Sequence, residues 1–163
     1  LRKGYLRRYF NREKGTAGLA ELLAREKTLE EVLIQGPIPE LPELSVIPSG
    51  RFPPNPSELL MRAEFETLLT DLNSRFDLII IDSPPTLAVT DPVVIGRYTG
   101  ATILVARHLE TMLGEVEAVR RAFETAGGKI TGAILNGYKI SEGSKYGGQY
   151  QYYNYRYSYK TDH

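Results

Sequence analysis

The sequence has no cysteine, no tryptophan, no net charge and no long hydrophobic run. The lack of cysteine excludes a disulfide framework and any thiolate metal site, and it suits a cytosolic domain. Because 20 basic side chains balance 20 acidic ones, no overall field attracts DNA or membrane lipid. No apolar run approaches the roughly 20 residues that a membrane-spanning helix needs. At 163 residues, the chain fits one domain with a core of its own.

Tyrosine, by contrast, is abundant, and most of it lies near the end of the chain. No Phe, Leu, Ile or Val accompanies the tyrosines there, so the segment is not an ordinary core strand. If every one were phosphorylated, the tail would gain roughly −10 to −14 charges. A set of phosphoacceptors, a half-buried edge strand and a sticky aromatic segment are all compatible with this composition. The seven tyrosines are Tyr146, Tyr150, Tyr152, Tyr153, Tyr155, Tyr157 and Tyr159.

The rest of the chain alternates between helical and strand patterns, which predicts a doubly wound α/β domain with a mainly parallel sheet. Continuous apolar runs are typical of strands buried on both faces. Such strands are predicted at 78–81, 101–106 and 130–135, with helices at 91–98 and 111–126 between them. Nearer the start, we expect a short helix within 15–25, a second from the Thr28 cap through Ile34, a short strand at 44–47, and one helix from Ser57 to about Asn73.

Asp82 is the strongest candidate for chemistry, because it directly follows the apolar run 78–81. Ligands of open parallel sheets bind at the carboxyl ends of the strands. A carboxylate there is typical of a Walker B element, which holds Mg²⁺ beside nucleotide phosphates. The alternative is that Asp82 only caps the next element. The chain contains no Walker A loop, so we expect it to be inactive alone.

Several motifs together resemble the bacterial protein-tyrosine kinase family, whose fold is P-loop NTPase-like. Arg2-Lys3-Gly4 is similar to the end of the family's variant second Walker A element, and 80–85 is similar to its Walker B. The stretches 53–60 and 87–91 resemble two further family segments, and 132–136 resembles the strand whose last residue, Asn136, lies near the nucleotide base. The tyrosine tail resembles the autophosphorylation cluster of the membrane autokinases that control capsule or exopolysaccharide polymerisation and export.

This resemblance implies a division of the chain and a set of functional residues. Residues 1–137 are expected to be the C-terminal part of a kinase domain, and 138–163 a flexible tail. ATP and Mg²⁺ are the implied cofactors, with Asp82 as metal ligand and catalytic residue, Arg2 as electrostatic support and Asn136 as a nucleotide contact. The seven tail tyrosines are the implied acceptors, phosphorylated in trans by a neighbouring subunit.

The resemblance also implies partners and a location. These are a ring-type homo-oligomer, the polysaccharide export machinery and a tyrosine phosphatase, with no nucleic acid. The location is a cytoplasmic domain of an inner-membrane protein whose membrane part lies upstream. Two other functions stay open, namely a partitioning ATPase of the ParA or MinD kind and a non-catalytic interaction module with a tyrosine-rich tail.

Overall fold

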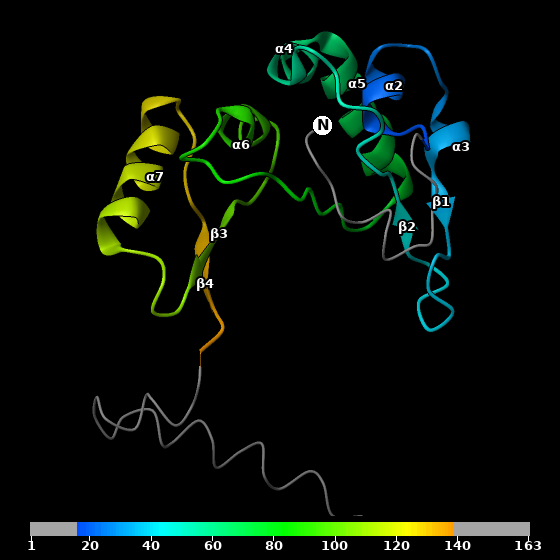
Figure 1. The fold of residues 1–163 in the computed structure, drawn as a ribbon. Coiled ribbons are helices and arrows are strands. Elements are labelled where there is room, and N and C mark those ends of the chain that lie inside the picture. The colour runs from blue at the N-terminus through cyan, green and yellow to red at the C-terminus, as the bar shows by residue number, and fades with distance from the viewer. Residues whose placement is uncertain (1–15, 139–163) are drawn as a thin grey trace, which may run out of the picture.

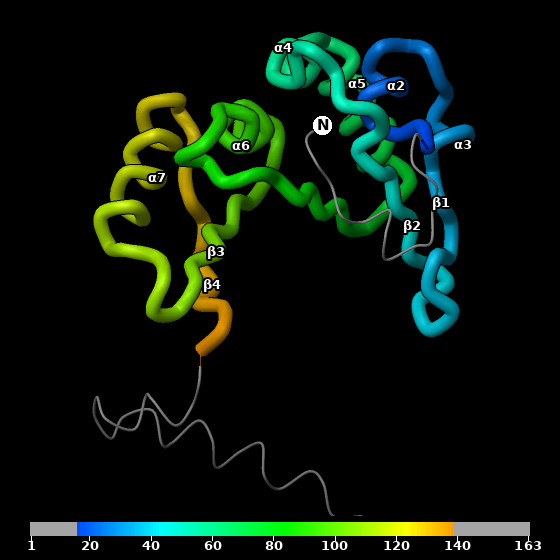
Figure 2. Tube along the Cα trace, viewed as in Figure 1, coloured from blue at the N-terminus to red at the C-terminus, as the bar shows by residue number. Residues whose placement is uncertain are grey.

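In this computed structural model the described residues are 16–138, and they form two groups of elements joined by an extended segment (Figures 1 and 2). The first group contains α2 (Leu19–Leu23), α3 (Leu29–Val32), β1 (Ile34–Gln35), β2 (Ser45–Val46), α4 (Pro56–Met61) and α5 (Ala63–Arg75). The second contains α6 (Asp91–Ile95), β3 (Ile103–Arg107), α7 (Leu113–Thr125) and β4 (Gly132–Asn136). Helix α6 packs on α4 and so connects the two groups.

The hydrophobic core belongs mainly to the first group. Its buried side chains come from α2, α3, α4 and α5, and Ile95 of α6 extends the same cluster. Burying aliphatic and aromatic side chains of this size contributes about 1.5–3 kcal/mol each. The buried members of the cluster are Leu23, Leu29, Val32, Leu59, Leu60, Phe65, Leu68, Leu72 and Ile95.

A close approach of two loops fixes the start of α2. The amides of Leu19 and Ala20 donate to the carbonyls of Pro48 and Ser49, at 2.8 and 3.1 Å. A Cβ on Gly18 would lie 2.2 Å from the Pro48 carbonyl oxygen, so this position requires glycine. The loop before α4 is thereby held against the first helix.

The Glu21 carboxylate is buried at the same junction. Its Oε2 accepts a hydrogen bond from the amide of Gly18, and its Oε1 accepts two from the amide and Nε of Arg51. Burial opposes the charge, but these donors outweigh burial and hold the pKa of Glu21 below its ordinary value. This carboxylate therefore stays charged and links α2 to the loop that precedes α4.

The second group is a strand–helix–strand unit with a parallel sheet. Strands β3 and β4 pair in parallel, with Ile103 opposite Gly132 and Arg107 opposite Asn136. The strands predicted at 101–106 and 130–135 are thus confirmed, each displaced by one or two residues at its ends. Helix α7 lies along one side of this pair (Figure 1).

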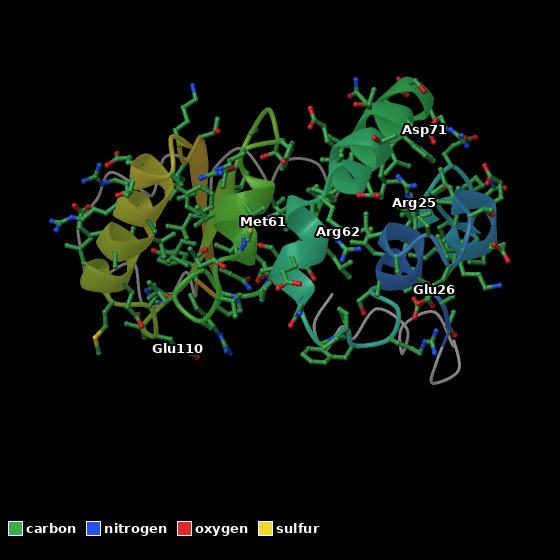
Figure 3. The ribbon with its side chains drawn as sticks, turned by 90° about the horizontal axis from the view of Figure 1, so that it is seen from above. Arg25, Glu26, Met61, Arg62, Asp71 and Glu110 are labelled. Carbon is green, nitrogen blue, oxygen red and sulfur yellow. The ribbon has the colours of Figure 1, made fainter. Side chains whose placement is uncertain are left out.

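Three local predictions were wrong. Ile34 was expected in a helix, but α3 ends at Val32 and Ile34 pairs with Val46 in the antiparallel pair β1–β2. Ser57 was expected to cap one long helix, but the helix begins at Pro56 and the Ser57 hydroxyl bonds Asp91. That long helix is also broken at Arg62, whose ψ is 154° (Figure 3).

The break at Arg62 has a packing reason. At about 100° per residue, an unbroken helix would point Leu59 and Leu60 about 160° away from Phe65, Leu68 and Leu72. Because all five side chains are buried, the chain must turn between the two sets. The break lets α4 and α5 present both sets to one core.

The prediction of a buried strand at 78–81 was also wrong. This run is extended, but no described residue pairs with its backbone. Ile79 and Ile81 pack against the core cluster, whereas Leu78 and Ile80 are exposed. A β-strand is defined by a hydrogen-bonded neighbour, and β3 and β4 pair only with one another among the described residues.

Candidate functional site

Asp82 lies at the end of the extended run 78–81, and its side chain is exposed. Within residues 16–138 its carboxylate makes no hydrogen bond or ion pair. The alternative role as a cap therefore has no support, because a capping carboxylate accepts a bond from a nearby backbone amide. Pro84 and Pro85 follow closely and restrict the backbone next to the carboxylate. Among the described residues, no side chain or backbone group occupies the Asp82 carboxylate.

Asn136 lies at the carboxyl end of β4. Its Oδ1 accepts a hydrogen bond from the amide of Gly137 at 2.9 Å, and its backbone carbonyl accepts one from the amide of His108. These two bonds fix the turn that follows the strand and leave the side-chain amide exposed. Both Asp82 and Asn136 thus end strand-like segments, although no hydrogen bond joins them among the described residues.

The other predicted site residues lie outside the described residues. These are Arg2 and the seven tail tyrosines, Tyr146, Tyr150, Tyr152, Tyr153, Tyr155, Tyr157 and Tyr159. Their assigned roles stay predictions.

Two side-chain contacts lie close to the end of β3, one between charged groups and one between aromatic rings. Arg107 forms an ion pair with Glu110 at 3.1 Å, and both side chains are largely exposed. His108 packs edge-on against Tyr138, with the ring centroids 5.0 Å apart. These contacts occupy Arg107 and Tyr138 within the chain itself, which favours local structural roles.

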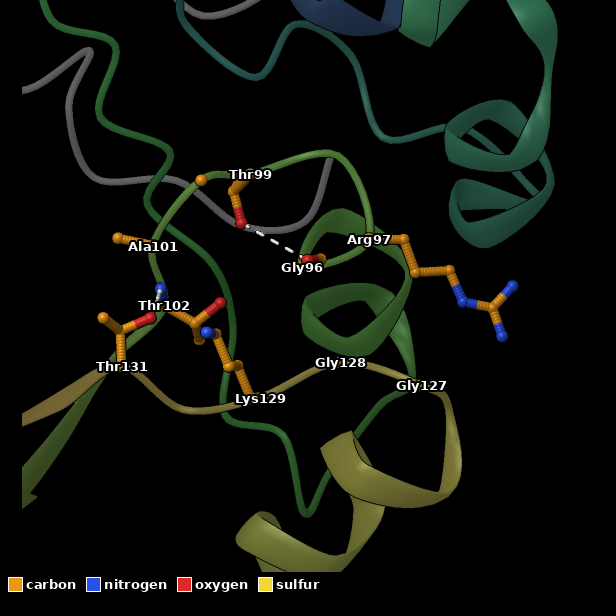
Figure 4. Close-up of a pocket in the computed structure, with 10 residues that line it drawn as sticks. Gly96, Arg97, Thr99, Ala101, Thr102, Gly127, Gly128, Lys129 and Thr131 are labelled. Atoms are coloured by element: carbon orange, nitrogen blue, oxygen red, sulfur yellow. Dashed lines mark hydrogen bonds between the residues drawn. The ribbon is translucent and has the colours of Figure 1, made fainter.

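A hollow of about 520 Å³ opens at the opposite ends of the same strands (Figure 4). It lies beside Thr102 and Thr131, which directly precede β3 and β4, and it includes neither Asp82 nor Asn136. Arg97 points away from Lys129 and the threonines (Figure 4). The hollow therefore lacks converging cations and is separate from the predicted site.

Sequence reasoning did not identify the role of Asp91, which is only 2% exposed. Its Oδ1 accepts a 2.6 Å hydrogen bond from the hydroxyl of Ser57. Both residues lie in stretches that resemble family segments, yet nothing in either stretch indicated that the two meet. A buried carboxylate of this kind holds α4 and α6 together and thereby positions the segment that carries Asp82.

Two absences within residues 16–138 bear on the site. No three His, Asp or Glu side chains gather there as a metal centre. No helix in that part of the chain combines the length and apolar character that crossing a membrane requires. Mg²⁺ is commonly held by one or two carboxylates together with phosphate oxygens and water, so the carboxylate of Asp82, which has no partner within this part of the chain, fits it.

Comparison with known proteins shows which proteins this chain is similar to. No protein-family model matches the chain. The tyrosine-protein kinase ptk of Acinetobacter johnsonii is 46% identical over 136 residues, which are 83% of this chain and 18% of that protein. The tyrosine-protein kinase wzc of Salmonella typhi is 37% identical over 158 residues, 96% of this chain and 21% of that protein. The chain thus spans about a fifth of the length of these relatives.

The fold is similar to that of solved kinase domains. The kinase domain of Escherichia coli tyrosine kinase ETK superimposes with a TM-score of 0.76 at 42% identity, over 83% of this chain and 52% of that domain. The parallel sheet, its helices and the likeness to these solved kinase domains therefore define an α/β protein of the P-loop NTPase-like class. Within that class, the chain belongs to the bacterial tyrosine-protein kinases and matches a part of their kinase domain.

Proposed function

We propose that this chain is part of an ATP-dependent protein-tyrosine autokinase. Residues 1–137 contribute to the kinase domain, and residues 138–163 form the tail that is phosphorylated. The observation that carries the proposal is the exposed carboxylate of Asp82, which has no partner among residues 16–138, in a chain of this family. A carboxylate that no internal cation occupies can accept Mg²⁺ directly or through water.

Each predicted residue has a distinct task. Asp82 holds Mg²⁺, and Asn136 contacts the base of ATP through its exposed amide. Arg2 adds positive charge near the phosphates. When bound, Mg²⁺ neutralises charge on the phosphoryl group during its transfer. A phenol has a pKa near 10, so the attacking tyrosine must have its proton removed or loosened.

The acceptors are the seven tail tyrosines, presented by a neighbouring subunit of a ring-type homo-oligomer. Each phosphate adds about −1.5 to −2 charges, so a fully phosphorylated tail repels its neighbours. We propose that this repulsion loosens the ring, and that a tyrosine phosphatase resets it. The cycle regulates the polymerisation and export of a capsular polysaccharide or exopolysaccharide, and the domain acts on the cytoplasmic side of an inner membrane.

The test uses the full-length parent protein, incubated with Mg·ATP before its phosphosites are mapped by mass spectrometry. We expect phosphate on several of the seven tail tyrosines. Asp82→Asn should abolish it, whereas Asp77→Asn, at the other end of the same apolar run, should not. ATP turnover without phosphotyrosine would instead indicate a partitioning-type ATPase. If neither reaction occurred, the chain would be an interaction module.

A further inference from the structure

Three large apolar side chains are exposed on the turn between β3 and α7 and at the start of α7. We call them the turn patch. Leu109 is 82% exposed, Met112 is 73% exposed and Leu113 is 83% exposed. Single exposed apolar residues are ordinary on a protein surface, whereas neighbouring ones are typical of interaction sites. Because these three lie within five consecutive positions, they favour a surface that another segment covers.

The backbone of Leu109 is also strained. Its φ is 61°, a left-handed conformation that is uncommon for residues other than glycine and is an outlier for a bulky side chain. The turn holds it there, because the carbonyl of Arg107 accepts from the amide of Thr111 at 2.9 Å, and the Thr111 hydroxyl accepts from the amide of Arg107 at 2.8 Å. Strain of this kind is concentrated at functional sites. The exposed leucine therefore points to a use for its side chain.

The tyrosine-rich tail follows the described residues at a point beside the turn patch. The ring of Tyr138 packs against that of His108, with the centroids 5.0 Å apart, and His108 directly precedes Leu109. Figure 1 shows the end of β4 and the turn after β3 at the same end of the strand pair. Tyr146 follows Tyr138 by eight residues, which span at most about 26–29 Å. The tail tyrosines are thus within reach of the patch.

The patch and the tail are chemically complementary. Tyrosine rings pack well on aliphatic side chains, and a methionine sulfur makes favourable contacts with aromatic rings. The charges match as well. Residues 107–115 carry one cation, Arg107, against two anions, Glu110 and Glu115. Residues 139–163 have the opposite balance, since four cations outnumber two anions, namely Lys139, Lys145, Arg156 and Lys160 against Glu142 and Asp162.

We propose that the segment 139–159 docks on the turn patch of its own chain while its tyrosines are unphosphorylated. The covalent tether favours this occupant, because it keeps the segment at an effective concentration on the order of millimolar. A docked tail is withheld from the neighbouring subunit, so the contact restrains phosphorylation in trans.

Phosphorylation ends the docking. Transfer of the γ-phosphoryl group of ATP to a tyrosine oxygen, which releases ADP and the phenolic proton, adds about −1.5 to −2 charges. These charges lie close to Glu110 and Glu115 in a docked tail, and a phosphate is too strongly hydrated to rest on apolar side chains. This release step rests on the proposed function, whereas the docking itself does not.

The test is photo-cross-linking of the full-length parent protein in the absence of ATP. The photo-reactive residue p-benzoylphenylalanine, which is aromatic like tyrosine, replaces Tyr146, Tyr150 or Tyr155 in three separate variants. After illumination, mass spectrometry maps the linked peptides, and a denaturing gel gives the number of chains that are joined. We expect cross-links to residues 108–113 in a product that has the mass of one chain.

Substitutions in the patch should weaken the cross-link. Leu113→Lys and Leu109→Gly should each reduce its yield about twofold or more, because each removes an apolar contact. Thr125→Lys is the control, since Thr125 is exposed at the last residue of α7, about 18 Å along the helix from Leu113. Leu109→Gly should also raise the melting temperature, because glycine adopts the positive φ without strain. A loss of docking in a more stable variant excludes unfolding as its cause.

The charge dependence is tested without any kinase reaction. In the variant with the photo-reactive residue at Tyr150, the other six tail tyrosines are replaced by glutamate or by phenylalanine. We expect the glutamate variant to lose the cross-link, because its negative charges oppose docking beside Glu110 and Glu115. The phenylalanine variant is the matched control and should keep the cross-link, because its rings remain uncharged and apolar.

Three results would overturn the proposal. They are cross-links that avoid 108–113, a product with the mass of two chains, which would assign the tail to a second copy, and equal yields from the glutamate and phenylalanine variants. None of these measurements uses ATP.

A final measurement with Mg·ATP tests the restraint. The tail of Leu113→Lys should be phosphorylated about twofold or more faster than that of Thr125→Lys, because a larger fraction of tails is free. Equal rates would refute the restraint. If neither variant made phosphotyrosine, the proposed function would fail and the docking would stand. Phosphotyrosine in a protein without the cross-link would do the reverse.

Discussion

The hydroxyl of Ser57 donates a 2.6 Å hydrogen bond to the carboxylate of Asp91, which lies 34 residues further along the chain. The bond joins α4 to the start of α6 and so connects the two groups of elements. Asp91 is almost completely buried, and a buried carboxylate depends on its donors. The stretch of chain between the two residues includes Asp82.

Removing the Ser57 hydroxyl should destabilise the fold. We expect Ser57→Ala to lower the free energy of unfolding by about 1–3 kcal/mol, because it removes a hydrogen bond to a buried charged group. Urea unfolding followed by circular dichroism measures the change. Ser74→Ala is the control, since the Ser74 hydroxyl donates to the carbonyl of Asp71 on an exposed surface. Equal losses in the two variants would contradict the role assigned to Ser57.

Glu21 should make the stability depend on pH. Its folded-state pKa lies below the ordinary value of 4.5, because the hydrogen bonds from Gly18 and Arg51 outweigh the effect of burial. A depressed pKa contributes stability above the unfolded-state pKa, and that contribution is lost as the pH falls through the folded-state value. The Arg51 side chain is 68% exposed, so its ion pair adds less than the hydrogen bonds do.

Glu21→Gln tests this dependence. At pH 7 it should lower the free energy of unfolding by about 1–3 kcal/mol, because it removes a charged acceptor from three donors. The difference in free energy of unfolding between wild type and variant should narrow as the pH falls below 4.5. Urea midpoints of wild type and variant, measured between about pH 3 and pH 7, give the stability of each protein as a function of pH. Glu43→Gln, at an exposed position, is the control at pH 7, and a gap that widened in acid would refute the assignment.

Two glycines should respond to alanine with opposite signs. Gly127 follows α7 with φ at +78°, a conformation that L-residues adopt only at a cost. Gly127→Ala should therefore destabilise the protein by about 1 kcal/mol. Gly114 lies inside α7 with open space around its Cα, so Gly114→Ala should stabilise it by about 0.5–1 kcal/mol. The melting temperatures of both variants test this prediction. Shifts of the same sign would contradict it.

The elements whose signals are local were predicted well from the sequence. The Thr28 hydroxyl accepts from the amide of Glu31, and the Glu31 carboxylate accepts from the amide of Thr28, so the spacing alone located the start of α3. The apolar runs of β3 and β4 were equally clear. Position and exposure also agree with a ligand role for Asp82, whose assignment stays a prediction.

The predictions that were wrong concern elements that depend on partners distant in the sequence. The run 78–81 has the composition of a buried strand, but pairing requires a neighbour that the described residues do not supply. Ser57 has the composition of a helix cap, yet Asp91 recruits its hydroxyl. The break at Arg62 could have been predicted from the sequence, because Leu60 and Phe65 cannot face one core on a continuous helix. Distant contacts of this kind leave no local pattern.

The last prediction concerns the acceptors. In the full-length parent, replacing all seven tail tyrosines by phenylalanine should abolish phosphotyrosine and leave ATP binding in place, since the change removes the acceptor hydroxyls and none of the residues assigned to the nucleotide. Tyr98→Phe is the control, because the Tyr98 ring packs edge-on against Phe65 with the centroids 5.5 Å apart. We expect that variant to keep its phosphotyrosine.

Phosphate persisting on the seven-fold variant would show that the acceptors lie elsewhere in the chain. An unchanged polymer length despite the loss of phosphotyrosine would separate phosphorylation from polysaccharide export.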